Sequence, residues 1–416
     1  MSEKKTILVI GAGPAGMMAA GTAAQSGAEV LLLEKNKRVG RKLLITGKGR
    51  CNITNNCDVK TMIESVPSNG KFLYSALNRF SPRDTICFFE EKGLPLKTER
   101  GSRVFPESDR ASDVVETLHQ FVKHTRCKLL SKKAMNLIIN HQKIEGVKLE
   151  DGRVIETDAV IVTCGGMSYP LTGSTGDGYR FARQAGHQII DPKPSLIPLV
   201  SHDTVCKNLQ GLSLKNISIT VKDQIKHRVV YKDFGELLFT HFGLSGPVIL
   251  SASAHMRQME QNRYTVLIDL KPALSIEKRD VRIQRDLQKY QNKALGNVLS
   301  HLLPRKLIPI IIEKLGVDPQ TKCNQITKKT RQELGRYLKM MEIPISGFRP
   351  IQEAIVTAGG VKTSEIDPKT MQSKLVKGLY FAGEVIDVDA YTGGFNLQIA
   401  FSTGFLAGNS AAGGEV

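Results

Sequence analysis

Three glycines near the amino terminus have the spacing of a phosphate-binding turn. Gly11, Gly13 and Gly16 follow the apolar run Thr6 to Ile10 and open a stretch of small residues, Pro14 to Ser26. In such a turn the first glycine permits a tight bend, the second lets a pyrophosphate approach the backbone, and the third lets helix and strand touch. The N–H groups that begin the helix can then bind phosphates. The spacing therefore predicts a dinucleotide-binding site.

An acidic residue stands where the ribose of a dinucleotide is expected. Glu34 ends a second apolar run, Val30 to Leu33, and Ala20 and Gly27 lie where the intervening helix must approach the sheet. The Glu34 carboxylate can accept hydrogen bonds from ribose hydroxyls and would repel a 2′-phosphate. The order strand, glycine turn, helix, strand predicts an α/β domain of Rossmann type.

Three further glycine-containing segments follow or contain predicted strands. They are residues 40–52, Val160 to Gly166, and 378–398 with its Gly383-Glu384 and Gly393-Gly394 pairs. Together they resemble flavoproteins of the glutathione-reductase type, in particular the fumarate-reductase branch. The resemblance implies FAD, with Glu384 accepting a ribityl hydroxyl and the Gly393-Gly394 turn starting a helix aimed at the flavin pyrimidine. Such a helix N-terminus stabilises the negative charge of a reduced flavin.

Two longer strings resemble one bacterial family more closely. Ile45 to Asn52 and Gly235 to Pro247 are similar to the aminoacetone-oxidase-family FAD-binding enzymes. These are also called NAD(FAD)-utilizing dehydrogenases and include a bile-acid-reducing member. The resemblance covers essentially the whole chain and implies an FAD domain with an inserted domain that has β-barrel-like and helical parts. It leaves the substrate open.

The residues expected to bind FAD are the glycines, helix starts and polar side chains of these segments. They are Gly11, Gly13, Pro14, Ala15, Gly16, Glu34, Lys35, Arg41, Lys42, Gly47, Gly49, Arg50, Cys51, Asn52, Ala134, Thr163, Cys164, Gly165, Gly166, Gly383, Glu384, Gly393, Gly394, Phe395, Asn396, Leu397 and Gln398.

Four residues are candidates for the chemistry itself. His241 could act as a general acid or bind a substrate oxyanion, or it could be a hydrogen-bonded structural histidine. Asn52 could hydrogen-bond the flavin or the substrate, or order its turn. Tyr391 could donate a proton near the flavin ring and Cys51 could act at the flavin edge, or both could simply pack.

Residues 35–50 carry seven Lys or Arg, three glycines and no acid, which predicts a basic loop and not a helix. Within it, Arg41 and Lys42 would pair with the pyrophosphate or an anionic substrate, or remain solvated. Further along the chain we expect buried strands at Ala159 to Val162 and Leu379 to Ala382, and a closing helix at Phe395 to Ala412.

Prolines near 192–198 and 344–350 mark two boundaries. We therefore expect a discontinuous FAD domain, residues 1–193 and 348–416, and an inserted substrate domain, residues 194–347. Within the insert, 194–273 is expected to be β-rich and 274–347 helical.

The chain is basic, with 58 Lys or Arg against 40 Asp or Glu and a net charge of +18. Half of this excess lies between Lys271 and Ile345, which hold 16 basic and 7 acidic residues. Such a region could meet nucleic acid, an acidic surface or an anionic substrate. The favoured interpretation is a solvated helical face, and with no Trp and few aromatics nearby a base-stacking platform is not expected.

The seven cysteines are scattered and contain no Cys-x-x-Cys, so neither a disulfide framework nor a metal site is expected. Lys4 and Lys5 before an apolar run mimic a signal peptide, but the glycine spacing favours a buried strand and helix. No run approaches the roughly 18 apolar residues of a membrane span. A cytoplasmic protein without membrane partners is expected, and its oligomeric state is left open.

These patterns predict an FAD-dependent oxidoreductase that passes a hydride between flavin N5 and a small organic substrate. Only one complete dinucleotide fingerprint is present, so NAD(P)H would have to act as a transient electron donor. Two alternatives stay open: a flavin oxidase that acts on an amine with O₂ as acceptor, and an RNA- or tRNA-binding flavoprotein.

Overall fold

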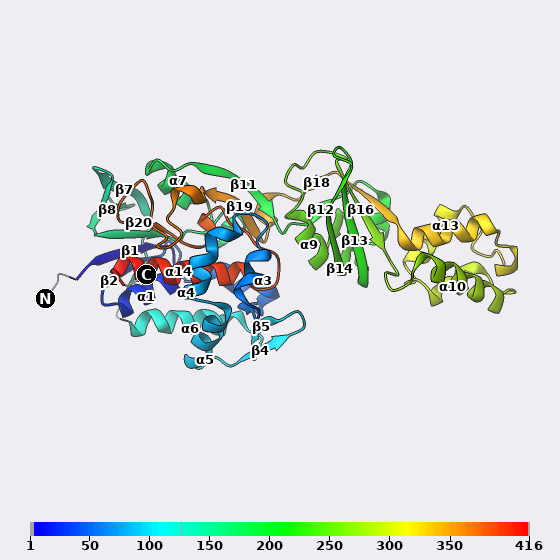
Figure 1. Ribbon diagram of the computed structural model, residues 1–416, viewed down its shortest axis with the longest axis horizontal. Coiled ribbons are helices and arrows are strands. Elements are labelled where there is room, and N and C mark those ends of the chain that lie inside the picture. The colour runs from blue at the N-terminus through cyan, green and yellow to red at the C-terminus, as the bar shows by residue number, and fades with distance from the viewer. Residues whose placement is uncertain (1–3, 126, 415–416) are drawn as a thin grey trace. The chain divides into compact units, whose positions relative to one another are not determined.

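The computed structural model describes residues 4–125 and 127–414 and divides the chain into two compact units. The terminal unit comprises Met1–Ser195 and Pro350–Val416, and the inserted unit comprises Leu196–Arg349 (Figure 1). Among the described residues, no helix combines the length and apolar character that crossing a bilayer requires.

A five-stranded parallel sheet forms the centre of the terminal unit, in the order β20-β10-β1-β2-β6. Its strands are β1 (Thr6–Ile10), β2 (Glu29–Leu33), β6 (Lys128–Leu130), β10 (Ala159–Val162) and β20 (Leu379–Phe381). All four residues of β10 and all three of β20 are buried, as expected for strands of a parallel sheet that is covered on both faces. The predicted Rossmann-type α/β fold is confirmed.

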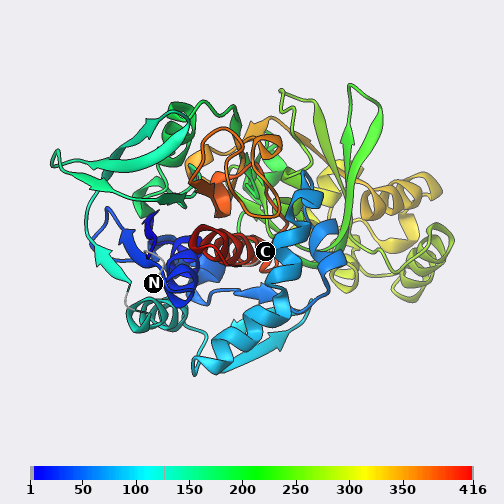
Figure 2. The ribbon, with the colours of Figure 1, turned by 60° about the vertical axis from the view of Figure 1, so that its left-hand side comes forward.

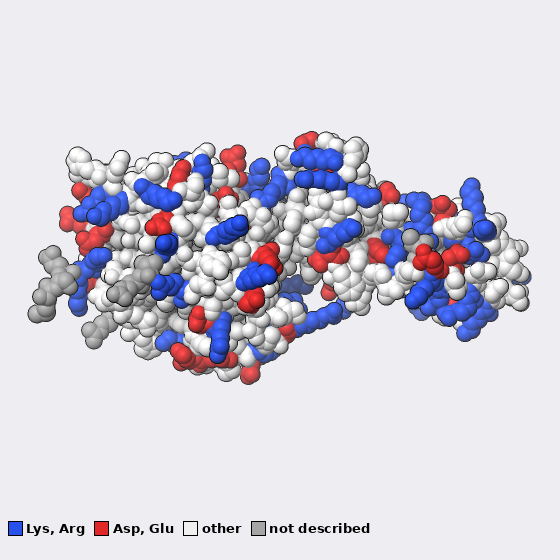
Figure 3. Space-filling view, in the orientation of Figure 1, with Lys and Arg blue, Asp and Glu red and all other residues white. Residues whose placement is uncertain are grey.

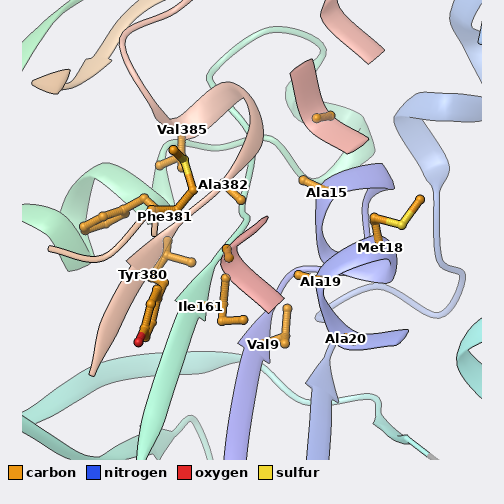
Figure 4. Packing of buried hydrophobic residues seen from close by; sticks show 14 of the residues in the cluster. Val9, Ala15, Met18, Ala19, Ala20, Ile161, Tyr380, Phe381, Ala382 and Val385 are labelled. Atoms are coloured by element: carbon orange, nitrogen blue, oxygen red, sulfur yellow. The ribbon is translucent and has the colours of Figure 1, made fainter. Parts of the chain in front are cut away.

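Two helices of small residues pack closely in this unit. They are α1 (Pro14–Gln25) and α14 (Phe395–Ala412), which lie side by side in Figures 1 and 2. A Cβ atom on Gly404 would lie 2.4 Å from the carbonyl oxygen of Ala15, and one on Gly408 would lie 2.3 Å from that of Ala19. The helices therefore meet backbone to backbone, and Figure 4 shows Ala19 beside Val9 of β1.

The expectation that residues 35–50 contain no helix is wrong. Arg41–Ile45 form the short helix α2, which begins after Gly40 in a left-handed conformation, φ +64°. A Cβ on Gly40 would lie 2.9 Å from a Val115 methyl group, and Leu43 is buried in the same core. Tertiary burial of one leucine face outweighs the glycine-rich local composition.

The remaining elements of the terminal unit surround the sheet. Its helices are α3 (Val59–Glu64), α4 (Tyr74–Arg79), α5 (Pro82–Glu91), α6 (Ala111–His124) and α7 (Asp177–Gln184). Three small antiparallel sheets consist of β3 (Thr54–Asn55), β4 (Leu96–Glu99) and β5 (Arg103–Pro106); β7 (Ala134–Asn140), β8 (Lys143–Leu149) and β9 (Val154–Glu156); and β11 (Ile189–Ser195) and β19 (Val356–Val361).

The inserted unit combines a seven-stranded antiparallel sheet, in the order β17-β16-β13-β14-β15-β12-β18, with a group of helices. The strands are β12 (Leu199–Val200), β13 (Ser213–Asp223), β14 (Arg228–Thr240), β15 (Gly243–Ser245), β16 (Tyr264–Asp269), β17 (Met341–Ile345) and β18 (Gly347–Phe348). The helices are α8 (Thr204–Asn208), α9 (Pro247–Ser253), α10 (Ile276–Lys289), α11 (Leu295–Val298), α12 (Leu307–Leu315) and α13 (Lys328–Lys339). Residues 341–345, expected to be helical, instead return to the sheet as β17, because their alternating burial fits one face of a strand.

Candidate functional site

The glycine turn between β1 and α1 has the geometry of a phosphate cradle. Gly11 has φ +105°, and a Cβ on Gly16 would lie only 1.8 Å from the Gly11 carbonyl oxygen. Gly13, directly before α1, has no atom within 4 Å of its would-be Cβ. The first and third glycines are thus required for packing, whereas the second faces open space in which a phosphate can approach the helix N-terminus.

Polar side chains at the carboxyl ends of the neighbouring strands hold this turn. The Thr163 hydroxyl, just after β10, lies 2.9 and 2.8 Å from the carbonyl oxygens of Ile10 and Gly11. Glu34, just after β2, accepts a hydrogen bond from the Ala12 N–H at 3.0 Å. Because the carboxyl ends of parallel strands share one edge, the strands bring these groups together at the crevice where such folds bind ligands.

Glu34 also accepts hydrogen bonds from the backbone and side-chain nitrogens of Asn36 at 2.8 and 2.7 Å. A carboxylate has about four acceptor positions, so three internal donors leave room for a ribose hydroxyl. The neighbouring Lys35 pairs with Asp177 at 2.6 Å, and Arg41 is exposed and donates to Asn36 at 2.8 Å.

A second polar cluster surrounds Glu384 at the end of β20. Its Oε2 accepts from Lys42 Nζ at 2.6 Å, and its Oε1 accepts from the Ser168 hydroxyl at 3.1 Å and from the Thr357 N–H at 2.8 Å. Lys42 also donates to Ser168 at 2.7 Å. A Cβ on Gly166 would lie 2.5 Å from the Thr357 hydroxyl, so glycine is needed there for the cluster to close. Every donor and acceptor of this network comes from the terminal unit.

The N-terminus of α14 lies against the segment that follows Cys51. Gly393 and Gly394 have φ +131° and +99°, and a Cβ on Gly394 would lie 2.3 Å from the carbonyl of Thr54. The Asn55 side chain donates to the Gly393 carbonyl at 3.1 Å. The positive end of this 18-residue helix is therefore fixed beside residues 51–55.

Asn52 has a buried Oδ1 atom with no hydrogen-bond partner among the described residues. An unpaired buried acceptor costs free energy unless a ligand supplies a donor. A flavin ring carries N–H groups that could fill this role. This orphan atom, the open space at Gly13 and the fixed N-terminus of α14 all fit FAD, so Asn52, the glycine turn, Glu34 and Glu384 would hold it.

Two of the predicted site residues instead fasten α14. The Asn396 amide accepts from the Ala390 N–H at 2.9 Å and donates to its carbonyl at 2.8 Å. The buried Gln398 accepts from the Thr54 hydroxyl at 2.6 Å and donates to the Phe80 carbonyl at 3.1 Å. Their side chains position the helix, so its backbone N–H groups, and not these side chains, would bind FAD.

Cys51 and Cys164 are thiols held in the protonated form. Burial raises the pKa of each to about 12, although a Thr46 hydroxyl partly offsets the effect at Cys51. Cys51 is fully buried and has a left-handed backbone, φ +59°. A thiol with such a pKa is not a nucleophile at neutral pH, so neither cysteine is a candidate for covalent chemistry.

The structure distributes the other predicted residues differently. Arg50 pairs with Glu99 and Asp109, both at 2.5 Å, and lies 4.2 Å over the Phe105 ring, which makes it a structural brace. Ala134 is buried at the start of β7. Tyr391 is half-buried in the terminal unit, and its carbonyl accepts from Asn396.

The remaining members of the predicted set occupy the turns already described. Pro14 and Ala15 form the first turn of α1, Phe395 and Leu397 the first turn of α14, and Gly383 the bend after β20. Gly165 lies after β10, and Gly47 and Gly49 lie in the left-handed stretch before Cys51.

His241 belongs to the inserted unit, where it is exposed in the two-residue turn between β14 and β15. Its ring packs edge-on against Phe242 at 5.0 Å. Ser168 and Thr357 are members of the Glu384 cluster that the sequence reasoning missed. Ser168 follows the Gly165-Gly166 pair, which could have signalled it, whereas Thr357 lies in a strand without any motif.

Three features define an FAD-binding flavoprotein of Rossmann type: the parallel sheet, the glycine turn after β1, and the glycines that follow strands β10 and β20. The chain belongs to the family described as HI0933-like protein Rossmann domain, whose model matches residues 5–410. It is an FAD-dependent oxidoreductase.

Curated relatives match nearly the full chain. The chain is 30% identical over 416 residues to the 3-dehydro-bile acid delta(4,6)-reductase of Clostridium scindens, covering 97% of this chain and 98% of that protein. It is 33% identical over 409 residues to the ribosomal RNA dihydrouridine synthase of Haemophilus influenzae, again covering 97% and 98%.

A solved structure with the same fold is the 3-ketosteroid-delta4-(5alpha)-dehydrogenase of Rhodococcus jostii in complex with 4-androstene-3,17-dione. Its TM-score is 0.55 at 13% identity, with 99% of this chain and 97% of that chain covered. The likeness shows a shared fold.

Proposed function

We propose that this flavoenzyme reduces a carbon–carbon double bond conjugated with a carbonyl group, and that the double bond is that of a uracil base in RNA. The observation that carries the proposal is the pair of full-length relatives. One is named for reduction of an unsaturated 3-oxo bile acid, the other for making dihydrouridine, which is uridine with its ring double bond reduced. Both reactions add a hydride and a proton across a conjugated double bond.

The cysteines support direct transfer between flavin and substrate. All seven lie in the described part of the chain and are free thiols. Burial raises the pKa of Cys51 and of Cys164 to about 12, so neither thiol is suited to a thiolate relay of the disulfide-reductase kind. When bound, FAD supplies the hydride.

The chain's own groups have three tasks in such a reaction. The Glu384 cluster and the glycine turn bind and orient the cofactor, and the N-terminus of α14 stabilises negative charge. Reduction also needs a proton for the second carbon of the double bond. Tyr391, two residues before Gly393, is our candidate donor, and His241 is the alternative.

The charge of the chain favours RNA over a steroid. A net charge of +18 attracts a polyanion such as RNA far more strongly than a bile acid, which carries a single carboxylate. NAD(P)H is proposed as the electron donor, and it would dock transiently because FAD would take the single dinucleotide fingerprint. A small enone, such as a 3-oxo steroid, remains the second candidate substrate because one relative is named for that class.

The test uses purified, FAD-loaded protein supplied with NADH or NADPH under anaerobic conditions. Protein-free ribosomal RNA transcribed in vitro, a Δ4,6-3-oxo steroid and buffer alone are compared. We expect dihydrouridine in the nuclease digest of the RNA. Reduction of the steroid alone would retain the reaction class but overturn RNA as the substrate, and peroxide formation with an amine in air would indicate an oxidase.

A further inference from the structure

The helical part of the inserted unit carries most of the excess of basic residues that lies between Lys271 and Ile345. Its helices α10 to α13 bury Ile283, Leu307, Ile311 and Leu334 in the core that they share with the sheet. The basic residues lie on the outside, and Figure 3 shows Lys and Arg gathered over α10.

Four cations occupy one face of α10. Lys278, Arg282, Arg285 and Lys289 are spaced four, three and four residues apart, which places them along one side of the helix. Lys278, Arg285 and Lys289 are exposed. The stripe is about 16 Å long at the helical rise of about 1.5 Å per residue. Only Asp286, itself buried, interrupts it, and both arginines neutralise that carboxylate at 2.6 and 3.6 Å.

A pair of stacked rings lies at the carboxyl end of the stripe. The rings of Tyr290 and His301 are 5.1 Å apart and inclined by 13°. The ammonium groups of Lys289 and Lys293 lie 5.4 and 5.0 Å from the Tyr290 ring centroid. Tyr290 is half-buried and His301 is exposed, so the His301 ring is the member of the pair that a base can reach.

The free cations distinguish this surface from an ordinary solvated helix. Within residues 4–125 and 127–414, Lys278, Lys289 and Lys293 form no ion pair, whereas Asp280 on another side of α10 is bound by Arg331 at 3.0 Å. A solvated face normally alternates charges so that neighbours pair. Unpaired cations beside a stacked aromatic pair instead suit a strand of RNA, with phosphates along the lysines and an unstacked base on the rings.

We propose that Lys278, Arg285, Lys289 and Lys293, together with Tyr290 and His301, form a docking surface for single-stranded or loop RNA. The inference rests on the proposed function, since it identifies how the RNA carrying the target uracil is held. An acidic protein or an anionic membrane would use the charges but gain little from a polar stacked pair. Those partners therefore become outcomes of the test.

Two variants of the FAD-loaded full chain separate the charges from the rings. K278E/K289E/K293E reverses exposed lysines, and Y290A/H301A removes the stack. K60E/K123E/K369E, three exposed lysines of the terminal unit, is the matched control. Binding of a fluorescein-labelled oligouridine RNA and of a stem-loop RNA is measured by anisotropy between 50 and about 300 mM salt.

We expect the triple lysine variant to bind RNA about tenfold or more weakly, with the slope of log affinity against log salt reduced by about 2 for three lost phosphate contacts. Y290A/H301A should bind about five- to tenfold more weakly with an unchanged slope. The control should bind like the natural protein. All variants should keep the flavin spectrum and the thermal transition.

Unchanged RNA binding by both variants would overturn the surface, as would tighter binding of phosphatidylglycerol vesicles than of RNA. The two proposals fail separately. If the natural protein binds RNA through these residues but reduces no uracil, the docking surface stands and the proposed uracil reductase activity is wrong. If all variants make dihydrouridine as well as the natural protein does, the proposed activity stands and the docking surface is wrong.

Discussion

The Nζ atom of Lys42 lies 2.6 Å from Oε2 of Glu384, joining helix α2 to the end of strand β20 across 342 positions of sequence. Ser168 closes the triangle by contacting both groups. The two charged side chains are each about 20% exposed, so the pair is shielded but within reach of a ligand. This link fixes the carboxylate that is expected to hold the ribityl chain of FAD.

Loss of the Glu384 charge should weaken FAD binding. In Glu384→Gln the shape is retained, but Lys42 loses its ion pair and the ribityl hydroxyls lose a charged acceptor. One hydrogen bond to a charged group contributes about 1.5–3 kcal/mol, so the FAD dissociation constant should rise about tenfold or more. Fluorescence titration of the apoprotein measures it. Lys132→Met, which breaks the pair with Asp151 at 3.1 Å, should leave it unchanged.

Gly13 and Gly16 should respond to alanine in opposite ways. At Gly13 the backbone is extended and the space is open, so Gly13→Ala should alter the unfolding free energy of the apoprotein by less than about 0.5 kcal/mol while blocking the pyrophosphate. At Gly16 the new methyl group would lie 1.8 Å from the Gly11 carbonyl and should disrupt the fold. Denaturant unfolding and FAD titration of both variants measure these two effects. Equal destabilisation would show that Gly13 is needed for packing as much as Gly16 is, and not for the approach of the pyrophosphate.

The start of α14 should tolerate no side chain at Gly394. Gly394→Ala adds a contact of 2.3 Å with the Thr54 carbonyl to a left-handed backbone, so we expect a loss of about 3 kcal/mol or more. Gly186→Ala is the control: its φ is +82°, but no atom lies within 4 Å, so only about 1–2 kcal/mol of backbone strain should appear. The difference in unfolding free energy isolates the packing of α14.

The strands and helices with strong local patterns could be predicted from the sequence. The expected elements form at Thr6–Ile10, Ala159–Val162 and Phe395–Ala412. Short apolar runs followed by glycines determine the two strands locally, and small residues after the Gly393-Gly394 pair determine the helix. Helix α2 could not be predicted, since it depends on Leu43 packing in a core made by distant residues. Nor could the brace between Arg50 and Glu99, since partners 49 residues apart have no local signature.

Contact between residues far apart in the sequence also explains why some residues of the candidate sites could not be predicted. Thr357 joins the Glu384 cluster only because β19 passes beside it, and Tyr290 meets His301 only because the segment that contains α11 folds back. The sequence contains few aromatics in the basic region, which suggested that no stacking platform would form. The fold brings two of its rings together.

His187 should make the protein less stable in acid. It is buried between Glu365, 3.2 Å from Nδ1, and the Ser373 hydroxyl, 2.7 Å from Nε2. Burial lowers the pKa of His187, although Glu365 partly opposes the shift. Below about pH 6.5 the unfolded chain therefore binds a proton that the folded chain does not, and acidification favours unfolding.

His187→Gln removes this proton and should flatten the decline in unfolding free energy between pH 7 and pH 5 by up to about 1.4 kcal/mol per pH unit. Denaturant unfolding at several pH values measures the slope. An identical slope in the variant would show that other groups govern the acid sensitivity.

The most direct test of the central claim is a single turnover that does not depend on the electron donor. The FAD-loaded protein is reduced with one equivalent of dithionite without oxygen, mixed with unmodified ribosomal RNA, and followed by its visible spectrum and by nucleoside mass spectrometry. We predict that the flavin bands return as dihydrouridine appears in equal amount. A flavin that stays reduced with RNA, and recovers its bands only when oxygen is admitted, would contradict the assignment as a uracil-reducing flavoenzyme.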